Sequence, residues 1–276
     1  MVSTQTEHRV LYADAGRIFE STADHYARYR LPYPEFLTNS VAALAHDHVA
    51  APRMVDLGCG PGPVSLALAS RGVDMLAVDP SSEMLATAKR RAAERGLLVD
   101  WRRGTGESIA DEQGAAGVSG AVIADAFHWM DRPRVLRQLD RVVASGGFVA
   151  ALCSHATGAP RPWWHDVVAA VRARYVGRVP AAGVGQDYVV PQGDHQALLR
   201  NSAFARTSVI RAEHTVRYTV EELVGVQFTY AYSSPALLGD QAGAFADDVA
   251  NALLGVEPSG MFEAEVTAAL ILGWRP

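Results

Sequence analysis

Apolar residues recur at helical spacing between positions 17 and 30 and predict a helix there. Pro32 ends this helix, because proline lacks an amide donor and restricts the residue before it. Pro34 suits the first turn of a second helix. The chain therefore begins with two helices, which we place in a helical segment of residues 1–50.

From position 54 onward, short continuous apolar runs alternate with helical patterns. The runs predict strands at residues 54–57, 75–78, 98–101, 121–124 and 148–152, and the intervening patterns predict helices at 64–70, 82–95 and 133–143. Ser82 is the expected N-cap of the second of these helices. Continuously apolar strands that alternate with helices are typical of a parallel sheet covered on both faces. The pattern therefore predicts an α/β, doubly wound fold.

The alternation becomes looser after Cys153. It predicts helices at 162–176, 195–201, 220–230 and 241–254, strands at 208–218 and 263–274, and a glycine-rich and proline-rich loop at 177–193. We therefore expect a core at residues 51–158, a helical cap at 159–206 and 219–258, and the last strands of the core sheet at 207–218 and 259–276.

Composition narrows the class of protein. The 276 residues are 49% hydrophobic and 20% charged, which favours a packed core over disorder. The net charge of −5 disfavours a nucleic-acid partner, and the apolar stretches are too short to span a membrane. The polar start predicts no signal peptide, and two cysteines fit a reducing compartment. We expect a cytoplasmic protein without a metal site; a homo-oligomer stays open.

A glycine cluster at residues 58–62 follows the first strand of the predicted core and precedes a helix. Such a turn brings a ligand against backbone amides at a helix N-terminus. Pro63 stands where a dinucleotide site would have its third glycine, so that fingerprint fails. Asp79 ends the next strand, about 20 residues on, where a carboxylate can accept both ribose hydroxyls. The alternative for Asp79 is an acidic residue favoured by the dipole of the next helix.

Four segments in this order resemble the class I S-adenosylmethionine-dependent methyltransferases. They are residues 55–62 (VDLGCGPG), 78–85 (VDPSSEML), 104–108 (GTGES) and 124–129 (ADAFHW). Residues 26–34 and 221–225 resemble the small-molecule subgroup that includes trans-aconitate methyltransferase. The resemblance implies a Rossmann-like, seven-stranded, mostly parallel sheet with an antiparallel last strand, and a helical cap.

The resemblance also implies a set of contacts to S-adenosylmethionine, with S-adenosylhomocysteine as the product. Asp79 would bind the ribose, and Arg30 beside Tyr26 would close over the carboxylate. Asp56 would hold the ammonium group indirectly, and Met84 would cover the adenine. The full set is Tyr26, Arg30, Asp56, Gly58, Cys59, Gly60, Gly62, Asp79, Pro80, Met84, Gly106, Glu107, Ala124 and His128.

Candidate catalytic residues are Asp125, His128 and Asp166. Asp125 stands where the family usually has an uncharged residue, and His128 follows a strand at the edge where α/β sheets bind ligands. The alternative for His128 is a packed histidine that orients its loop. His155 and His165 are further candidate bases, although surface positions are the stronger expectation for both.

Aromatic residues predict the binding site of the methyl acceptor. Trp163 and Asp166 are three residues apart in the predicted helix 162–176 and would share a face. The expected slot consists of Tyr26, Phe127, Trp129, Trp163 and Asp166. Aromatic walls with one carboxylate suit a flat, electron-rich acceptor. The alternative is aromatic packing between cap and core.

Together these features predict methyl transfer from S-adenosylmethionine to a small apolar or aromatic acceptor of the natural-product type, such as an indole or a phenol. Carbon, oxygen and nitrogen acceptors stay open. One alternative is a protein that binds S-adenosylmethionine without methylating, such as a cyclase. A nucleic-acid methyltransferase is disfavoured, because residues 125–128 lack the Asn/Asp-Pro-Pro-aromatic loop commonly used for methylation at an amino group of a base.

Overall fold

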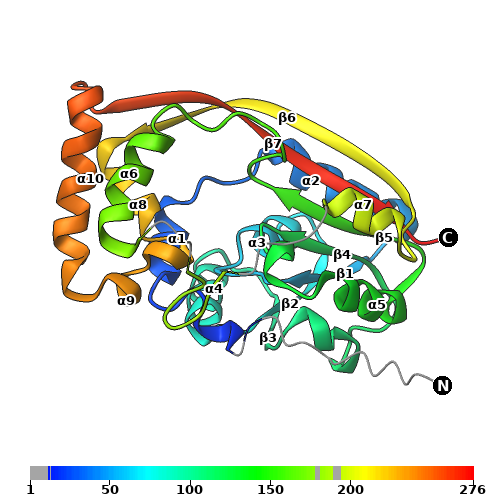
Figure 1. Ribbon diagram of the computed structural model, residues 1–276. Helices are drawn as coiled ribbons and strands as arrows, with labels where there is room; N and C mark the ends of the chain where they lie inside the picture. Colours follow the sequence, from blue (N-terminus) through cyan, green and yellow to red (C-terminus); the bar gives the residue numbers. More distant parts are fainter. Residues whose placement is uncertain (1–11, 13, 178–180, 189–193) are drawn as a thin grey trace, which may run out of the picture.

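The computed structural model describes residues 12, 14–177, 181–188 and 194–276 (Figure 1). Its sheet has seven strands in the order β3-β2-β1-β4-β5-β7-β6. The strands are β1 (Arg53–Leu57), β2 (Asp74–Asp79), β3 (Asp100–Arg103), β4 (Val118–Ala124), β5 (Val143–Cys153), β6 (Arg206–Thr219) and β7 (Met261–Trp274). The first five strands pair in parallel, and β7 runs antiparallel to both β5 and β6. The predicted fold class is confirmed.

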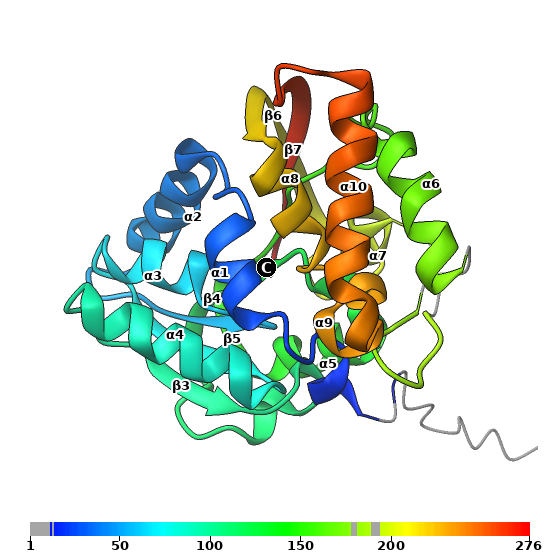
Figure 2. The same ribbon diagram turned by 90° about the vertical axis from the view of Figure 1, so that its left-hand side faces the viewer.

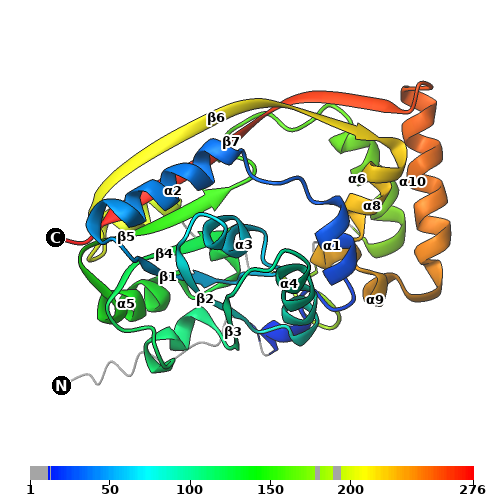
Figure 3. The same ribbon diagram turned by 180° about the vertical axis from the view of Figure 1, so that it is seen from behind.

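Helices cover both faces of the core sheet, as its continuously apolar strands require. The helices of the first half of the chain are α1 (Ala23–Tyr29), α2 (Glu35–His48), α3 (Pro63–Ala69), α4 (Ser82–Glu94) and α5 (Arg132–Val142). Apolar residues of α2 and α3 form one core cluster with the sheet, and α2 runs alongside β5 (Figure 3). Residues of α5 and of α7 (His195–Arg200) pack in a second cluster. The N-cap of α4 is Ser81 rather than Ser82, because the Ser81 hydroxyl accepts from the amide of Met84.

The β6–β7 hairpin extends beyond the core and carries the cap. Only residues 269–274 of β7 pair with β5, whereas the rest of β7 pairs with β6 alone. The cap helices are α6 (His165–Val176), α8 (Val220–Gln227), α9 (Pro235–Leu238) and α10 (Ala242–Val256). They enclose an apolar cluster around Phe245 and Phe262. Figure 2 shows α6 and α10 on the side opposite α2, α3 and α4, with α1 between the two groups.

Side-chain packing crosses two of the expected domain boundaries, and the division into domains stays a prediction. Helix α7 falls within the predicted cap range 159–206, yet Leu199 packs in the core cluster with α5. The outer part of the hairpin, assigned to the core sheet, contributes Val216 and Phe262 to the cap cluster. Short apolar strands predict a sheet, but they do not reveal how far a long hairpin reaches past it.

The predicted helix 17–30 is broken into two pieces. A 3₁₀ turn, η1 (Ala15–Arg17), is followed by an irregular stretch and then by α1. Ser21, between them, has a φ of 64°, a conformation that a helix does not contain. The other 3₁₀ turns are η2 (Gly106–Asp111), η3 (Phe127–Trp129), η4 (Ala231–Ser233) and η5 (Gly239–Gln241).

Within the described part of the chain, we find no helix that is long and apolar enough to cross a membrane.

Candidate functional site

The glycine turn after β1 uses backbone conformations that favour glycine. Gly58, Gly60 and Gly62 have φ values of 68°, 54° and 78°. A Cβ atom on Gly62 would lie 2.7 Å from the Trp101 ring, so a side chain there would have to displace that ring. A Cβ atom on Gly60 would meet no protein atom within 4 Å. The backbone at Gly60 therefore borders open space that a ligand can approach.

Asp79, at the end of β2, holds this turn in place. One carboxylate oxygen accepts from the amide of Gly60 and the other from the amide of Ser81, both at 2.8 Å. Burial raises the pKa of Asp79 to about 6. A carboxylate has about four lone-pair sites, so these two bonds leave acceptor capacity on Asp79 for a ligand's hydroxyl groups.

Asp56, in β1, carries a buried oxygen that has no partner among the described residues. Its Oδ2 accepts from the hydroxyl of Ser65 at 2.5 Å, whereas Oδ1 makes no hydrogen bond. Burial raises the pKa of Asp56 to about 7. An unsatisfied buried acceptor is costly, and a cationic donor in the adjoining space would satisfy it.

Both carboxylates line a small cavity of about 110 Å³ at the carboxyl edge of the sheet. Its lining includes ten further residues of the predicted cofactor set or slot, namely Tyr26, Gly58, Cys59, Gly60, Pro80, Met84, Gly106, Glu107, Ala124 and Trp129. Gly62, Arg30 and His128 are outside this lining. The sequence motifs therefore converge on one cavity, as the resemblance implies.

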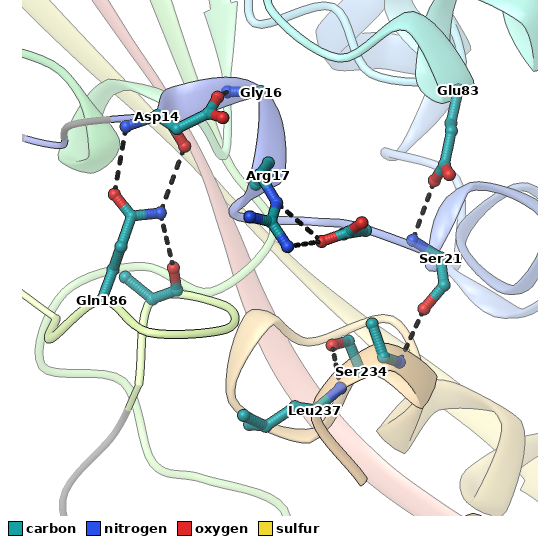
Figure 4. Close-up of polar contacts among 11 residues, drawn as sticks. Asp14, Gly16, Arg17, Ser21, Glu83, Gln186, Ser234 and Leu237 are labelled. Atoms are coloured by element: carbon teal, nitrogen blue, oxygen red, sulfur yellow. Dashed lines mark hydrogen bonds and ion pairs between the residues drawn. The ribbon is translucent and has the colours of Figure 1, made fainter. Parts of the chain in front are cut away.

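Residues 14–22, here called the strap, cover the small cavity and contribute Ala15, Ile18 and Phe19 to its lining. Figure 4 shows how polar contacts tie the strap to three parts of the molecule. The amide of Ser21 donates to Glu83 of α4, and the Ser21 hydroxyl accepts from the amide of Ala236 in α9, both at 2.8 Å. Asp14 exchanges hydrogen bonds with Gln186 at 3.2 and 3.1 Å. The strap is thus fastened to core and cap together.

A large cavity of about 760 Å³ lies between the core and the cap. Tyr26, Tyr33, Pro63 and Asp125 line both cavities, so they form the junction between them. The Asp125 carboxylate is fixed there, because it accepts from the Tyr33 hydroxyl at 2.9 Å and from the amide of Ser154 at 3.0 Å. Burial raises the pKa of Tyr33 well above its ordinary value, which keeps that hydroxyl protonated as a donor.

Arg30 lines the large cavity. Its Nε donates to the Thr229 hydroxyl at 2.8 Å, and its guanidinium lies 5.0 Å from the Tyr26 ring and 4.4 Å from the Tyr230 ring. Tyr26 belongs to the junction between the two cavities, so the Arg30 guanidinium lies next to that junction. Its predicted contact with a cofactor carboxylate stays a prediction.

The predicted placement of Trp163 and Asp166 was wrong. The Trp163 side chain packs on Phe262 and donates to the carbonyl oxygen of Glu263, and Asp166 is 99% exposed beside His165. Neither residue lines either cavity. Helix α6 begins only at His165, so Trp163 precedes it and the helical spacing argument does not hold. The face that α6 turns to the large cavity is formed by His165, Val168 and Arg172.

The predicted aromatic slot is not assembled. Phe127 is 1% exposed in the core, with its ring against His195. His128 packs on Trp129 outside both cavities, and burial lowers its pKa. Trp129 lines the small cavity and contacts the strap through Phe19.

Other side chains line the large cavity instead. His155 and His165, weaker candidates from the sequence, are among them. Residues that the sequence did not single out are Arg172, His214, Gln227, Tyr230 and Tyr232. They come from the cap and the hairpin, where no motif marks them.

Comparison with known proteins agrees with this geometry. Residues 54–147 match a family described as a methyltransferase domain. An uncharacterized methyltransferase of Mycobacterium bovis is 32% identical over 134 residues, 49% of this chain and 51% of the relative. A ubiquinone biosynthesis O-methyltransferase of Methylococcus capsulatus is 34% identical over 105 residues, 38% of this chain and 44% of the relative. The chain thus spans about half the length of the curated relatives that it matches.

Solved structures extend the comparison to most of the chain. A putative methyltransferase from an antibiotic biosynthesis pathway of Anabaena variabilis has a TM-score of 0.57 at 17% identity. The similarity covers 86% of this chain and 96% of that one. At this identity the similarity shows the fold alone.

Proposed function

We propose that the chain transfers a methyl group from S-adenosylmethionine to a small molecule in the large cavity, because residues 54–147 match a methyltransferase domain. The observation that carries the proposal is the junction at Asp125. There the cavity built from the glycine turn, Asp56 and Asp79 meets a second cavity roofed by the cap. A methyl donor and an acceptor bound in these two spaces would adjoin one another.

The residues of the small cavity fit S-adenosylmethionine. The unpartnered Oδ1 of Asp56 suits the ammonium group, and the open space at Gly60 suits close approach to the backbone. Asp79 keeps acceptor capacity for ribose hydroxyls while it fixes the turn. When bound, S-adenosylmethionine supplies an electrophilic methyl group, and the protein supplies binding and orientation.

Asp125 is the best placed candidate for a catalytic residue. Tyr33 and Ser154 orient its carboxylate at the junction, where it can hold a positive charge that develops on the acceptor or receive a proton from it. His155 lines the same cavity, and burial lowers its pKa, so its imidazole is neutral at pH 7 and able to accept a proton. The strap and the cap would exclude water from both spaces.

The volume of the large cavity supports a small acceptor. Pockets for drug-sized ligands measure roughly 300–1,000 Å³, and this cavity of about 760 Å³ lies within that range. Tyr26, Tyr230, Tyr232 and Trp164 give it aromatic walls, which supports an aromatic or apolar body of the acceptor.

Label transfer tests this function. The chain is incubated with S-adenosylmethionine tritiated at the methyl group and with the small-molecule fraction of a cell extract. We expect tritium in an extractable small product, and we expect Asp125→Asn to lower the rate by ~10² or more while S-adenosylhomocysteine affinity stays the same. Absence of transferred tritium with the wild-type chain, or tritium found only in nucleic acid, would contradict the proposal.

A further inference from the structure

The charged side chains that line the large cavity are nearly all cationic. They are Arg28, Arg30, Arg91, Arg95, Arg161 and Arg172, and the one acidic residue among the described lining is Asp125. The chain as a whole carries a net charge of −5, so composition does not explain this excess. The positive charge is concentrated at the cavity.

Most of these arginines lack a carboxylate partner in the part of the chain that the structure describes. Arg28 pairs with Glu221 at 3.1 Å, but none of the other five forms an ion pair with a described residue. The carboxylate of Asp125 is already engaged by Tyr33 and Ser154. The cavity therefore contains more guanidinium groups than its own acidic residue can neutralise.

Two of the unpaired arginines are held by aromatic rings. Arg172 of α6 lies 4.6 Å from the Tyr232 ring, and Arg30 lies between Tyr26 and Tyr230. Contact with a ring face orders a guanidinium but leaves its N–H donors available. A partly buried cation without a counterion is costly, and an anionic ligand would offset that cost.

The remaining lining adds two properties. Trp164, Val168, Val216 and Leu223 provide an apolar wall. Gln227 is buried, and its Nε2 donates to the carbonyl oxygen of Leu223, whereas its Oε1 has no partner among the described residues. Among the described residues, the cavity thus offers an apolar surface, guanidinium donors without a carboxylate partner, and the unpartnered oxygen of Gln227.

We infer that the acceptor is an organic anion, with an apolar or aromatic body and a carboxylate or phosphate group that pairs with Arg172. The free oxygen of Gln227 would accept from a hydroxyl or N–H of the same molecule. This inference rests on the proposed function, because it names the class of molecule methylated in the large cavity. It differs from the sequence expectation of an acceptor recognised by aromatic residues and one carboxylate.

A matched pair of fluorescent probes tests the inference without knowledge of the acceptor. 8-Anilinonaphthalene-1-sulfonate has an apolar body with one anionic group, and N-phenyl-1-naphthylamine has the same body without it. We expect the sulfonate to bind at least ~10-fold more tightly than the neutral probe, since one charge-assisted pair changes the Kd by about that factor. We expect Arg172→Gln to remove this preference and to leave affinity for the neutral probe unchanged.

Arg174→Gln is the control on the same helix. Its side chain is 60% exposed, pairs with Asp248 and lies outside the cavity, so this variant should retain the preference for the sulfonate. Competition by 1-naphthaleneacetate or by 1-naphthyl phosphate would show which anionic group the site prefers. Equal affinity for the two probes, no binding of the sulfonate, or an unchanged preference in Arg172→Gln would overturn the inference.

Calorimetry with S-adenosylhomocysteine on the same samples separates the two proposals. If Arg172→Gln binds this product as the wild-type chain does, the variant is folded and its probe result stands. If the wild-type chain binds the product but shows no preference for the anionic probe, the inference fails and the methyl-transfer proposal survives. If the wild-type chain does not bind the product, the proposed function fails.

Discussion

Replacement of Asp56 by Asn should stabilise the protein at alkaline pH while weakening its proposed cofactor site. The carboxylate is buried, with one oxygen bonded to Ser65 and the other without a partner among the residues that the structure describes. Burial raises its pKa from the ordinary 3.8 to about 7. Asparagine keeps the size of the side chain and an acceptor for Ser65, but it removes the buried charge.

The pKa of Asp56 sets the size and sign of the effect. Because the folded-state pKa lies above the unfolded value, the folded protein holds the Asp56 proton more tightly than the unfolded chain does. The resulting contribution to stability is fully present below about pH 4. It is lost as the pH rises through about 7. Between pH 5 and pH 8 the wild-type chain should therefore lose about 2–3 kcal/mol of unfolding free energy through this residue. Asp56→Asn lacks this titration.

Urea unfolding of both chains at pH 5 and pH 8 measures the effect. Subtracting the unfolding free energy of the wild-type chain from that of Asp56→Asn cancels the contributions of the other titrating groups. From pH 5 to pH 8 this difference should change by about 2–3 kcal/mol, in the direction that makes the variant relatively more stable. Calorimetry at pH 8 should show S-adenosylhomocysteine bound ~10-fold or more weakly by the variant, because a charge-assisted contact is lost. A stability difference that is the same at both pH values would refute the assignment of a raised pKa. Unchanged affinity would refute the ammonium contact.

Three further changes test the surrounding geometry. Ser21→Ala removes the acceptor for the amide of Ala236. Loss of a hydrogen bond of ~1 kcal/mol should make S-adenosylhomocysteine dissociate roughly 5-fold faster in a stopped-flow measurement. An unchanged dissociation rate would mean that the strap does not retain the ligand. Gly62→Ala places a Cβ atom 2.7 Å from Trp101 at a φ of 78°, and chemical denaturation should show an unfolding free energy about 1–3 kcal/mol lower than that of the wild-type chain. An unchanged unfolding free energy would show that the turn can adapt. Asp166→Asn should retain the wild-type kcat, because that side chain is 99% exposed outside both cavities; a fall of ~10² would restore it as a catalytic candidate.

The core sheet and the small cavity could be predicted from the sequence because their determinants are local. A glycine turn needs glycine at positions of positive φ, and a buried parallel strand needs a continuous apolar run. Gly58, Gly60 and Asp79 lie within 22 residues of one another in the chain, and the β1–β2 pairing brings them together. Sequence order alone therefore places these residues at one edge of the sheet.

The large cavity could not be predicted in the same way. Its walls come from α1, α6, α8 and the β6–β7 hairpin, which meet only through tertiary packing. Arg172 and Gln227 belong to no motif, and their proposed role follows from the absence of a carboxylate or donor partner among the described residues. The start of α6 shows how a small boundary difference matters, since three residues separate the predicted start at 162 from His165. Trp163 therefore precedes the helix, and Asp166 is exposed on the face of α6 that does not line the cavity.

Calorimetric titration of the wild-type chain with S-adenosylhomocysteine tests the central claim most directly, with NAD as the control ligand and Asp79→Ala as the control variant. The account predicts one bound S-adenosylhomocysteine per chain and no binding of NAD. It also predicts a ~10–100-fold loss of affinity in Asp79→Ala, because this residue fixes the glycine turn through Gly60 and would accept from the ribose hydroxyls. Binding of NAD in place of S-adenosylhomocysteine, or equal affinity in Asp79→Ala, would contradict the account.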